Sequence, residues 1–209
     1  MELAGGLHVR LSIIPAAAAP AHDHRQAGKN GEIWFKGLGA TRARALPLMD
    51  RVSAENRRLA ELLDESKLIY LLGGSPDFLA KTLMGSLCWN AVISAYGKGA
   101  VLAGSSAGAM VLCEHYVDPG ENKLEPGLNL LPGVCVLPHH NTFGKGWARG
   151  LTRKYPQILF VGIDEETGII NDGPEGQWQI YGKGGAMIYR GGWSKGYTKG
   201  DFFDLSRQE

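Results

Sequence analysis

Two continuous apolar runs, each closed by very small residues, constrain the fold more than any other feature of this chain. Residues 67–74 read KLIYLLGG, and residues 100–106 read AVLAGSS. A strand that is apolar at nearly every position is buried on both faces, as in a parallel sheet covered by helices. A helical pattern over 78–99 separates the two runs. This strand–helix–strand order indicates an α/β architecture with a mostly parallel sheet.

Other segments extend the pattern along the 209 residues. Strands are predicted at 8–15, 133–141, 158–166 and 167–172, a helix at 107–116, and one or two hairpins over 176–192. The chain contains no internal repeat, and no linker rich in proline or serine divides it. We therefore predict a single domain over residues 1–209.

Composition narrows the classes of function. The formal net charge is +1, without a basic patch that has interleaved aromatics, which argues against nucleic-acid binding. No apolar run approaches the roughly 20 residues that span a bilayer, and the first residues lack the basic region of a signal peptide. We expect no membrane partner and a cytoplasmic location. Cys88, Cys113 and Cys135 lie in apolar surroundings, as buried thiols do.

The second apolar run ends in the sequence Gly104-Ser105-Ser106-Ala107-Gly108, which matches Gly-x-Ser-x-Gly at a strand-to-helix turn. Active groups collect at the carboxyl ends of strands in such sheets. In a nucleophile elbow the central serine occupies a strained turn and needs small neighbours, which Gly104, Ala107 and Gly108 supply. This pattern favours Ser106 as a nucleophile. The alternative is a glycine-rich turn that only lets a helix pack closely on the sheet.

A serine nucleophile needs a base, usually histidine, and a carboxylate that orients the base. His139 and His140 follow a predicted strand, whereas His115 lies too far along the helix predicted after Ser106. The candidate acids are Asp164, Glu165 and Glu166 at the end of another strand, and Asp118 and Glu121 after the predicted elbow helix. The glycine pair that closes 67–74 offers backbone amides for an oxyanion hole.

Four segments together resemble the cyanophycinase and peptidase E family of serine peptidases. They are LIYLLGGSPDFL at 68–79, AVLAGSSAGAM at 100–110, VLPHHNTF at 136–143 and VGIDEETGII at 161–170. Their order and approximate spacing agree with the family over nearly the whole chain. The resemblance implies a class I glutamine amidotransferase-like fold, a three-layer α/β sandwich with a mostly parallel central sheet, here with C-terminal β-hairpins.

The resemblance also implies the roles of individual residues. Ser106 would be the nucleophile, His139 the general base and Glu165 the acid that orients the base. Some accounts of the family place the acid soon after the elbow, which keeps two alternatives, Asp118 and Glu121. The amides of Gly74 and Ala107 would form the oxyanion hole. The reaction is hydrolysis of a peptide or isopeptide bond, next to aspartate in some members, and the family suggests a homodimer.

This chain departs from cyanophycinases around the histidine. Leu137-Pro138 replaces the Asp-Gln that precedes the catalytic histidine, and His140 takes a position usually held by Phe or Tyr. The family's arginine cluster is replaced by NTFGKGWARG, in which Lys145 and Arg149 are the cations. We therefore expect a substrate other than cyanophycin, namely a peptide or small amide. Lys145 or Arg149 would bind a carboxylate of that substrate, unless both are solvated surface charges.

Two other functions remain as alternatives. One is a catalytically silent binding module of the same fold, which would need a broken triad. The other is a glutamine amidotransferase-like amidase, although that chemistry normally uses a cysteine at the elbow position of Ser106. A metal site at His22 and His24 lacks further ligands nearby, so we predict no metal and no cofactor.

Overall fold

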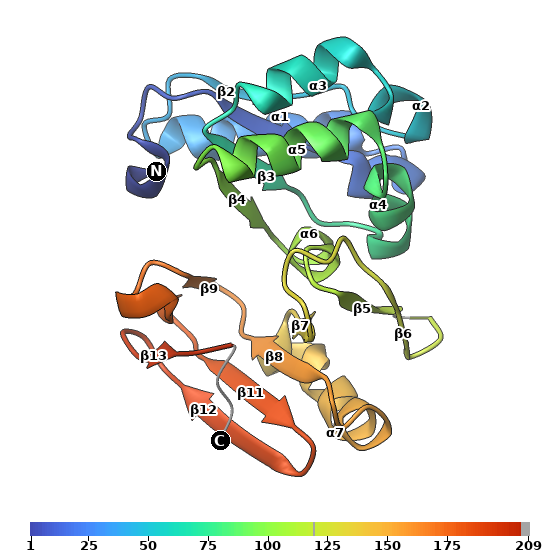
Figure 1. Ribbon diagram of the computed structural model, residues 1–209, viewed down its shortest axis with the longest axis vertical. Coiled ribbons are helices and arrows are strands. Elements are labelled where there is room, and N and C mark those ends of the chain that lie inside the picture. The colour runs from blue at the N-terminus through green and yellow to red at the C-terminus, as the bar shows by residue number, and fades with distance from the viewer. Residues whose placement is uncertain (119, 206–209) are drawn as a thin grey trace. The chain divides into compact units, whose positions relative to one another are not determined.

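The computed structural model describes residues 1–118 and 120–205, and the chain divides into two compact units, Met1–Val111 and Leu112–Glu209. The first unit contains a four-stranded parallel sheet in the order β2-β1-β3-β4 (Figure 1). Its strands are β1 (Leu11–Ile14), β2 (Ala43–Ala45), β3 (Leu68–Leu71) and β4 (Val101–Gly104). The two apolar runs form the neighbouring strands β3 and β4, so the predicted parallel sheet is confirmed.

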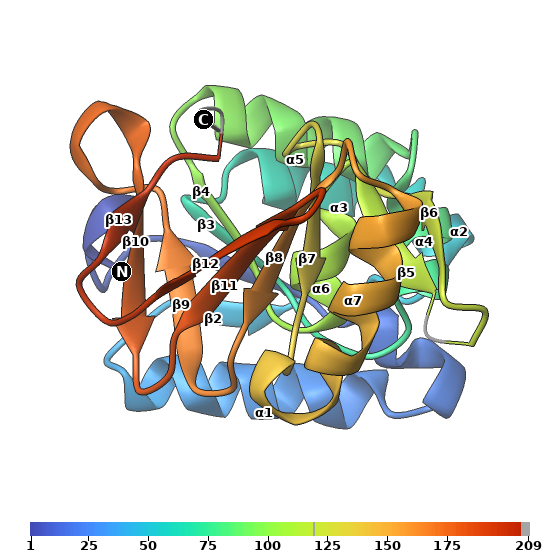
Figure 2. The same ribbon diagram turned by 90° about the horizontal axis from the view of Figure 1, so that it is seen from below.

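Helices cover both faces of this sheet. They are α1 (His24–Gly37), α2 (Arg51–Ala54), α3 (Arg57–Asp64), α4 (Pro76–Leu83), α5 (Leu87–Gly97) and α6 (Ala107–Val111), with 3-10 helices at Glu2–Ala4 and Ala16–Ala21. Figure 2 shows α1 on one face of the sheet and α3 with α5 on the opposite face. Phe35 of α1 belongs to a buried cluster with Ile13 and Leu68 of the sheet. Leu63 of α3 and Val92 of α5 are fully buried.

The segment 78–99, predicted as a single helix, lies in the two helices α4 and α5 instead. Gly85 takes a left-handed φ of 65° between them, and the Ser86 side chain caps α5 by accepting a hydrogen bond from the Trp89 amide. Within the described ranges, no single helix is long and apolar enough to cross a membrane. By length and composition α4 and α5 pass that test together, but the chain bends by 85° between them.

The second unit is built from short strands and the helix α7 (Lys145–Lys154). Its strands are β5 (His115–Asp118), β6 (Lys123–Pro126), β7 (Val134–Leu137), β8 (Leu159–Ile163), β9 (Thr167–Ile170), β10 (Trp178–Gly182), β11 (Ala186–Arg190), β12 (Trp193–Tyr197) and β13 (Phe202–Phe203). The largest sheet has the order β12-β11-β8-β7, in which β7 and β8 are parallel and the other pairs antiparallel. The helix α7 packs on β7, β8 and β11 of this sheet.

Smaller elements complete the second unit. β5 pairs with β6, and β10 lies between β9 and β13 in a three-stranded antiparallel sheet. A π-helix spans His140–Gly144, directly before α7, and a 3-10 helix spans Pro174–Gly176. The loop after β7 therefore connects a strand of the parallel pair to α7, the helix that packs on that strand.

The helix predicted over 107–116 extends too far toward the C-terminus. The structure ends α6 at Val111, and a strand, β5, begins at His115. Tyr116 and Val117 are buried in β5, and aromatic and β-branched residues fit such a pleated, half-buried surface well. His115 therefore lies in a strand, and its distance from Ser106 does not follow from the helix predicted over 107–116.

The predicted C-terminal β-hairpins are confirmed, but with different partners. β9 and β10 form one antiparallel pair, and β11 and β12 form another, so 176–192 does not fold back on itself. β10 pairs with β9, which precedes that segment, and β11 pairs with β12, which follows it. The prediction of a single domain stays a prediction.

Candidate active site

Ser106 stands at the turn between β4, which ends at Gly104, and α6, which begins at Ala107. Its φ is 49°, in the left-handed region that residues with a side chain seldom occupy. The amide of Ser105 donates a hydrogen bond to the Leu71 carbonyl of β3, at 3.1 Å, which holds the turn onto the sheet. Strained backbone at a serine between a strand and a helix is the geometry of a nucleophile elbow.

The glycines on either side of Ser106 allow a very close approach of α6 to the sheet. A Cβ atom on Gly108 would lie 2.1 Å from the Leu71 carbonyl oxygen, and one on Gly104 would lie 2.5 Å from the Gly108 carbonyl carbon. Both positions therefore exclude any side chain. The small residues of the motif serve helix packing and the elbow at once, so the two interpretations of the sequence describe one structure.

The turn after β3 lies beside the serine. A Cβ atom on Gly73 would lie 3.1 Å from the Ser106 Cβ. At Gly74, whose φ is 141°, a Cβ atom would lie 2.2 Å from the Ala17 carbonyl oxygen. No hydrogen bond between described residues uses the amide of Gly74 or that of Ala107. Donors without a protein acceptor are what an oxyanion hole requires.

A histidine–carboxylate pair lies in the second unit. His139 Nδ1 and Glu165 Oε1 are 3.1 Å apart, and the imidazole stacks on Phe143 with ring centroids 5.0 Å apart. His139 follows β7 and Glu165 follows β8, and these strands are parallel neighbours in the register Leu137↔Gly162. Because the carboxyl ends of parallel neighbours meet, two residues 26 positions apart come into hydrogen-bonding contact.

The loop that carries His139 is held by its own side chains and backbone. His139 has a left-handed φ of 52°, and its carbonyl accepts hydrogen bonds from the Gly144 amide, at 3.0 Å, and from the Thr142 hydroxyl, at 2.9 Å. Asn141 Oδ1 accepts a hydrogen bond from the Glu165 amide at 3.0 Å. The side-chain amide of Asn141 thus connects the histidine loop to Glu165, and the only signal for this role in the sequence is the position of Asn141 beside the histidines.

The second histidine has a different environment. His140 is 6% exposed, and its Nε2 lies 2.8 Å from the Tyr189 hydroxyl while its Nδ1 lies 3.4 Å from Asp164 Oδ1. Its ring covers Gly162, where a Cβ atom would lie 2.3 Å from the imidazole Cδ2. Burial and the Asp164 charge raise the pKa of Tyr189. Both ring nitrogens of His140 are therefore engaged inside the unit, unlike those of a residue that meets a substrate.

The other candidate acids stabilise turns. Asp118, at the end of β5, accepts hydrogen bonds from the amides of Gly120, at 2.7 Å, and Glu121, at 3.2 Å. Glu121 pairs with the Lys123 ammonium. Glu166 pairs with Lys183, and this pairing raises the pKa of the lysine. These contacts occupy carboxylates that sequence alone left as alternatives to Glu165.

The remaining predicted residues take no part in the His139–Glu165 pair. Lys145 and Arg149 are exposed on α7, and His22 and His24 belong to the first unit, on either side of the start of α1. In the part of the chain that the structure describes, no group of three or more His, Cys, Asp or Glu side chains could hold a metal ion.

The cysteines are buried thiols. Cys88, Cys113 and Cys135 are all free and buried. Burial raises the pKa of Cys88 to about 11 and that of Cys113 to about 12, and it raises the pKa of Cys135 well above its usual range. Because the thiolate is the reactive form of cysteine, none of these thiols is activated as a nucleophile.

A strained serine elbow in an α/β fold, together with a histidine–carboxylate pair, defines a class of protein, the serine hydrolases. The model of peptidase family S51 matches residues 2–177. The chain therefore belongs to peptidase family S51 and is a serine peptidase.

Individual relatives agree with this assignment. The chain is 27% identical over 199 residues to the cyanophycinase of Geminocystis herdmanii, covering 90% of this chain and 72% of the relative. It is 28% identical over 196 residues to the cyanophycinase of Trichormus variabilis, covering 88% of this chain and 64% of that protein. The crystal structure of a peptidase from an acI-B1 Actinobacterium matches with a TM-score of 0.80 and 28% identity, over 93% of this chain and 83% of the other.

Proposed function

We propose that Ser106 attacks the carbonyl carbon of a peptide or isopeptide bond and that His139 accepts the serine proton. Collapse of the tetrahedral intermediate breaks the C–N bond, and His139 returns the proton to the leaving amine. Water then hydrolyses the acyl-enzyme on Ser106 by the same route. The left-handed backbone of Ser106 at the strand-to-helix turn is the observation that carries this proposal.

Glu165 has an orienting role in this mechanism. A carboxylate that accepts a hydrogen bond from Nδ1–H fixes the imidazole tautomer whose Nε2 is the base, and it stabilises the imidazolium that forms. The 3.1 Å contact between His139 and Glu165 supports this role. The amides of Gly74 and Ala107 are proposed as the donors for the oxyanion, each contributing on the order of 3 kcal/mol in the transition state.

The substrate is proposed to be a peptide or small amide with an aspartate next to the scissile bond. The cyanophycinase names belong to relatives that are 27% and 28% identical, and this chain replaces the residues around the histidine by Leu137-Pro138 and His140. We therefore expect little hydrolysis of cyanophycin, and dipeptides of the type Asp-X and β-Asp-X are the first substrates to test. A profile of dipeptides, with unrelated dipeptides as controls, distinguishes these substrates. The homodimer and the cytoplasmic location stay predictions.

A fluorophosphonate probe tests the nucleophile directly. We expect the folded wild-type protein to be labelled once near neutral pH, with the adduct mapped to Ser106 by peptide mass spectrometry. Iodoacetamide should leave the activity intact, because the thiols are buried and protonated. A folded protein that stays unlabelled would support the silent binding module, and inactivation by iodoacetamide would support an amidase with a cysteine nucleophile.

Substitution of the acid gives a second test. Glu165→Gln should slow both labelling and hydrolysis by about 10²- to 10⁴-fold, because an amide at this position favours the wrong imidazole tautomer. Glu166→Gln is the matched control, since Glu166 pairs with Lys183 instead. The rate of probe labelling measures the effect without knowledge of the substrate. Equal rates for the two variants would remove Glu165 from the mechanism and return Asp118 and Glu121 as candidates.

A further inference from the structure

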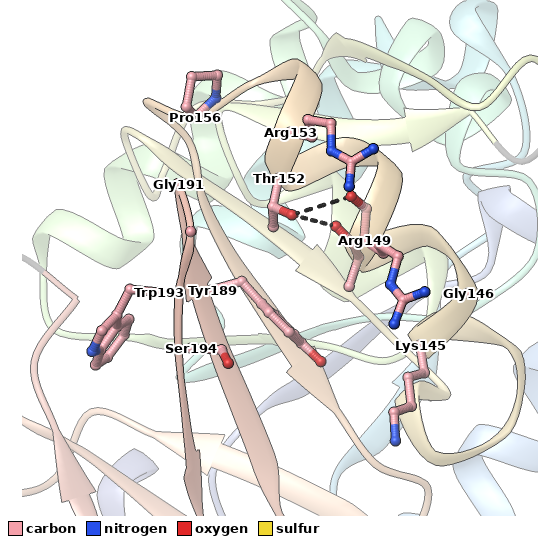
Figure 3. Close-up of a pocket in the computed structure, with 12 residues that line it drawn as sticks. Lys145, Gly146, Arg149, Thr152, Arg153, Pro156, Tyr189, Gly191, Trp193 and Ser194 are labelled. Carbon is pink, nitrogen blue, oxygen red and sulfur yellow. Dashed lines mark hydrogen bonds between the residues drawn. The ribbon is translucent and has the colours of Figure 1, made fainter.

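A groove of about 840 Å³ lies in the second unit, between α7 and the pair of strands β11 and β12 (Figure 3). Its lining is made of cationic, hydroxyl, aromatic and small residues, and no acidic residue contributes. One wall comes from a face of α7, and the opposite wall comes from the end of β11, the turn that follows it and the start of β12. The groove therefore has a basic wall on α7 and an opposite wall that carries Tyr189 and Ser194, both within one unit.

The basic wall consists of Lys145, Arg149 and Arg153, which follow one another at intervals of four residues on α7. Residues with this spacing lie on one face of a helix, about 6 Å apart along its axis. Among the residues that the structure describes, none of the three forms an ion pair with a carboxylate. The wall thus presents a row of three uncompensated positive charges.

The opposite wall carries an aromatic ring and a hydroxyl group. Figure 3 shows the Tyr189 side chain directed toward the cations of α7, whereas the indole of Trp193 points away from that helix. Tyr189 is partly exposed, and it pairs with Ser194 across β11 and β12, so these two residues share the face that lines the groove. Exposed aromatic rings provide contact area at low cost in conformational entropy, as they do in many peptide-binding surfaces.

We propose that this groove binds an extended acidic peptide segment whose carboxylates occupy alternate positions. In an extended chain, side chains on one face recur about every 7 Å, which is close to the spacing of the cations on α7. Arginine binds carboxylates through two parallel hydrogen bonds, so Arg149 and Arg153 select carboxylate over neutral side chains. A row of three cations along a helix fits a chain of carboxylates better than it fits a small ion.

The groove is connected to the histidine loop by covalent and hydrogen-bonded contacts. Lys145 begins α7 immediately after the π-helix His140–Gly144, and the Tyr189 hydroxyl lies 2.8 Å from His140 Nε2. One end of a peptide segment bound in the groove therefore lies near His140, the residue that follows His139. The assignment of this segment to the substrate rests on the proposed function, whereas its binding to the groove does not.

Fluorescence anisotropy tests the binding. The probe is a fluorescein-labelled peptide in which glutamate alternates with serine, and the protein is the Ser106→Ala variant, so that no turnover occurs. We expect Arg153→Glu, introduced into this variant, to weaken binding by about tenfold, because one attraction is lost and one repulsion is added at an exposed site. Lys154→Glu is the matched control: it makes the same change of charge on the same helix, but Lys154 lies over the Tyr155 ring and does not line the groove.

Three results would overturn the proposal that the groove binds an acidic peptide. They are equal weakening by Arg153→Glu and Lys154→Glu, equal binding of a peptide with glutamine in place of glutamate, and tighter binding of a short single-stranded DNA than of the acidic peptide. Binding should also weaken between about 0.05 M and about 0.5 M salt, since exposed charges are screened. Because these measurements use Ser106→Ala, failure of the wild-type protein to react with a fluorophosphonate would refute the proposed chemistry and leave the groove to be judged separately.

Discussion

Ser106→Ala is expected to lower kcat/KM for the cleaved dipeptide by about 10⁴-fold or more and to abolish labelling by a fluorophosphonate. Removal of the hydroxyl removes the atom that forms the proposed acyl-enzyme. Residual hydrolysis above the rate in water would come from the oxyanion donors and from binding. Steady-state kinetics and intact-protein mass spectrometry measure the two effects.

Ser105→Ala is the matched control for this loss. Ser105 contributes its amide to the Leu71 carbonyl, and alanine keeps that hydrogen bond. We expect this variant to retain labelling and hydrolysis within a few-fold of the wild type. If Ser105→Ala abolished labelling while Ser106→Ala kept it, the nucleophile would be the wrong serine, and the role of the left-handed turn would have to be abandoned.

Gly108→Ala is expected to destabilise the protein by about 3 kcal/mol or more, because the new Cβ would overlap the Leu71 carbonyl oxygen at 2.1 Å. Backbone cannot move aside as the end of a flexible side chain can, so α6 must shift away from β3. That shift would displace the elbow, and activity should fall together with stability. Urea unfolding followed by far-UV circular dichroism gives the free energy of unfolding.

A glycine in α7 provides the comparison. A Cβ atom on Gly150 would have no neighbour within 4 Å, so Gly150→Ala replaces a poor helix former by a good one without a clash. We expect a gain of up to about 1 kcal/mol in the free energy of unfolding. Similar effects at the two positions would show that the close approach of α6 to the sheet does not restrict Gly108.

The sequence was enough to predict where four strands end, namely β3 and β4 in the first unit and β7 and β8 in the second. Continuous apolar runs at 67–74 and 100–106 admit little besides buried parallel strands, and the small residues after them mark the sharp turns. The same reasoning placed the histidines and the acids at the ends of strands. It could not supply Asn141 or Tyr189, because their contacts depend on which strands become neighbours.

The sequence by itself determined where the elbow lies, since a local pattern of glycine, serine and alanine at a strand end is enough to define it. The residues alone left His139 and His140 open and the family resemblance favoured His139, but only the tertiary structure shows which of the two contacts Glu165. The left-handed turn at His139 directs its imidazole toward Glu165, while His140 is buried over Gly162 between Asp164 and Tyr189. These contacts of the two histidines depend on strand pairing over long distances in the chain, and no local pattern encodes them.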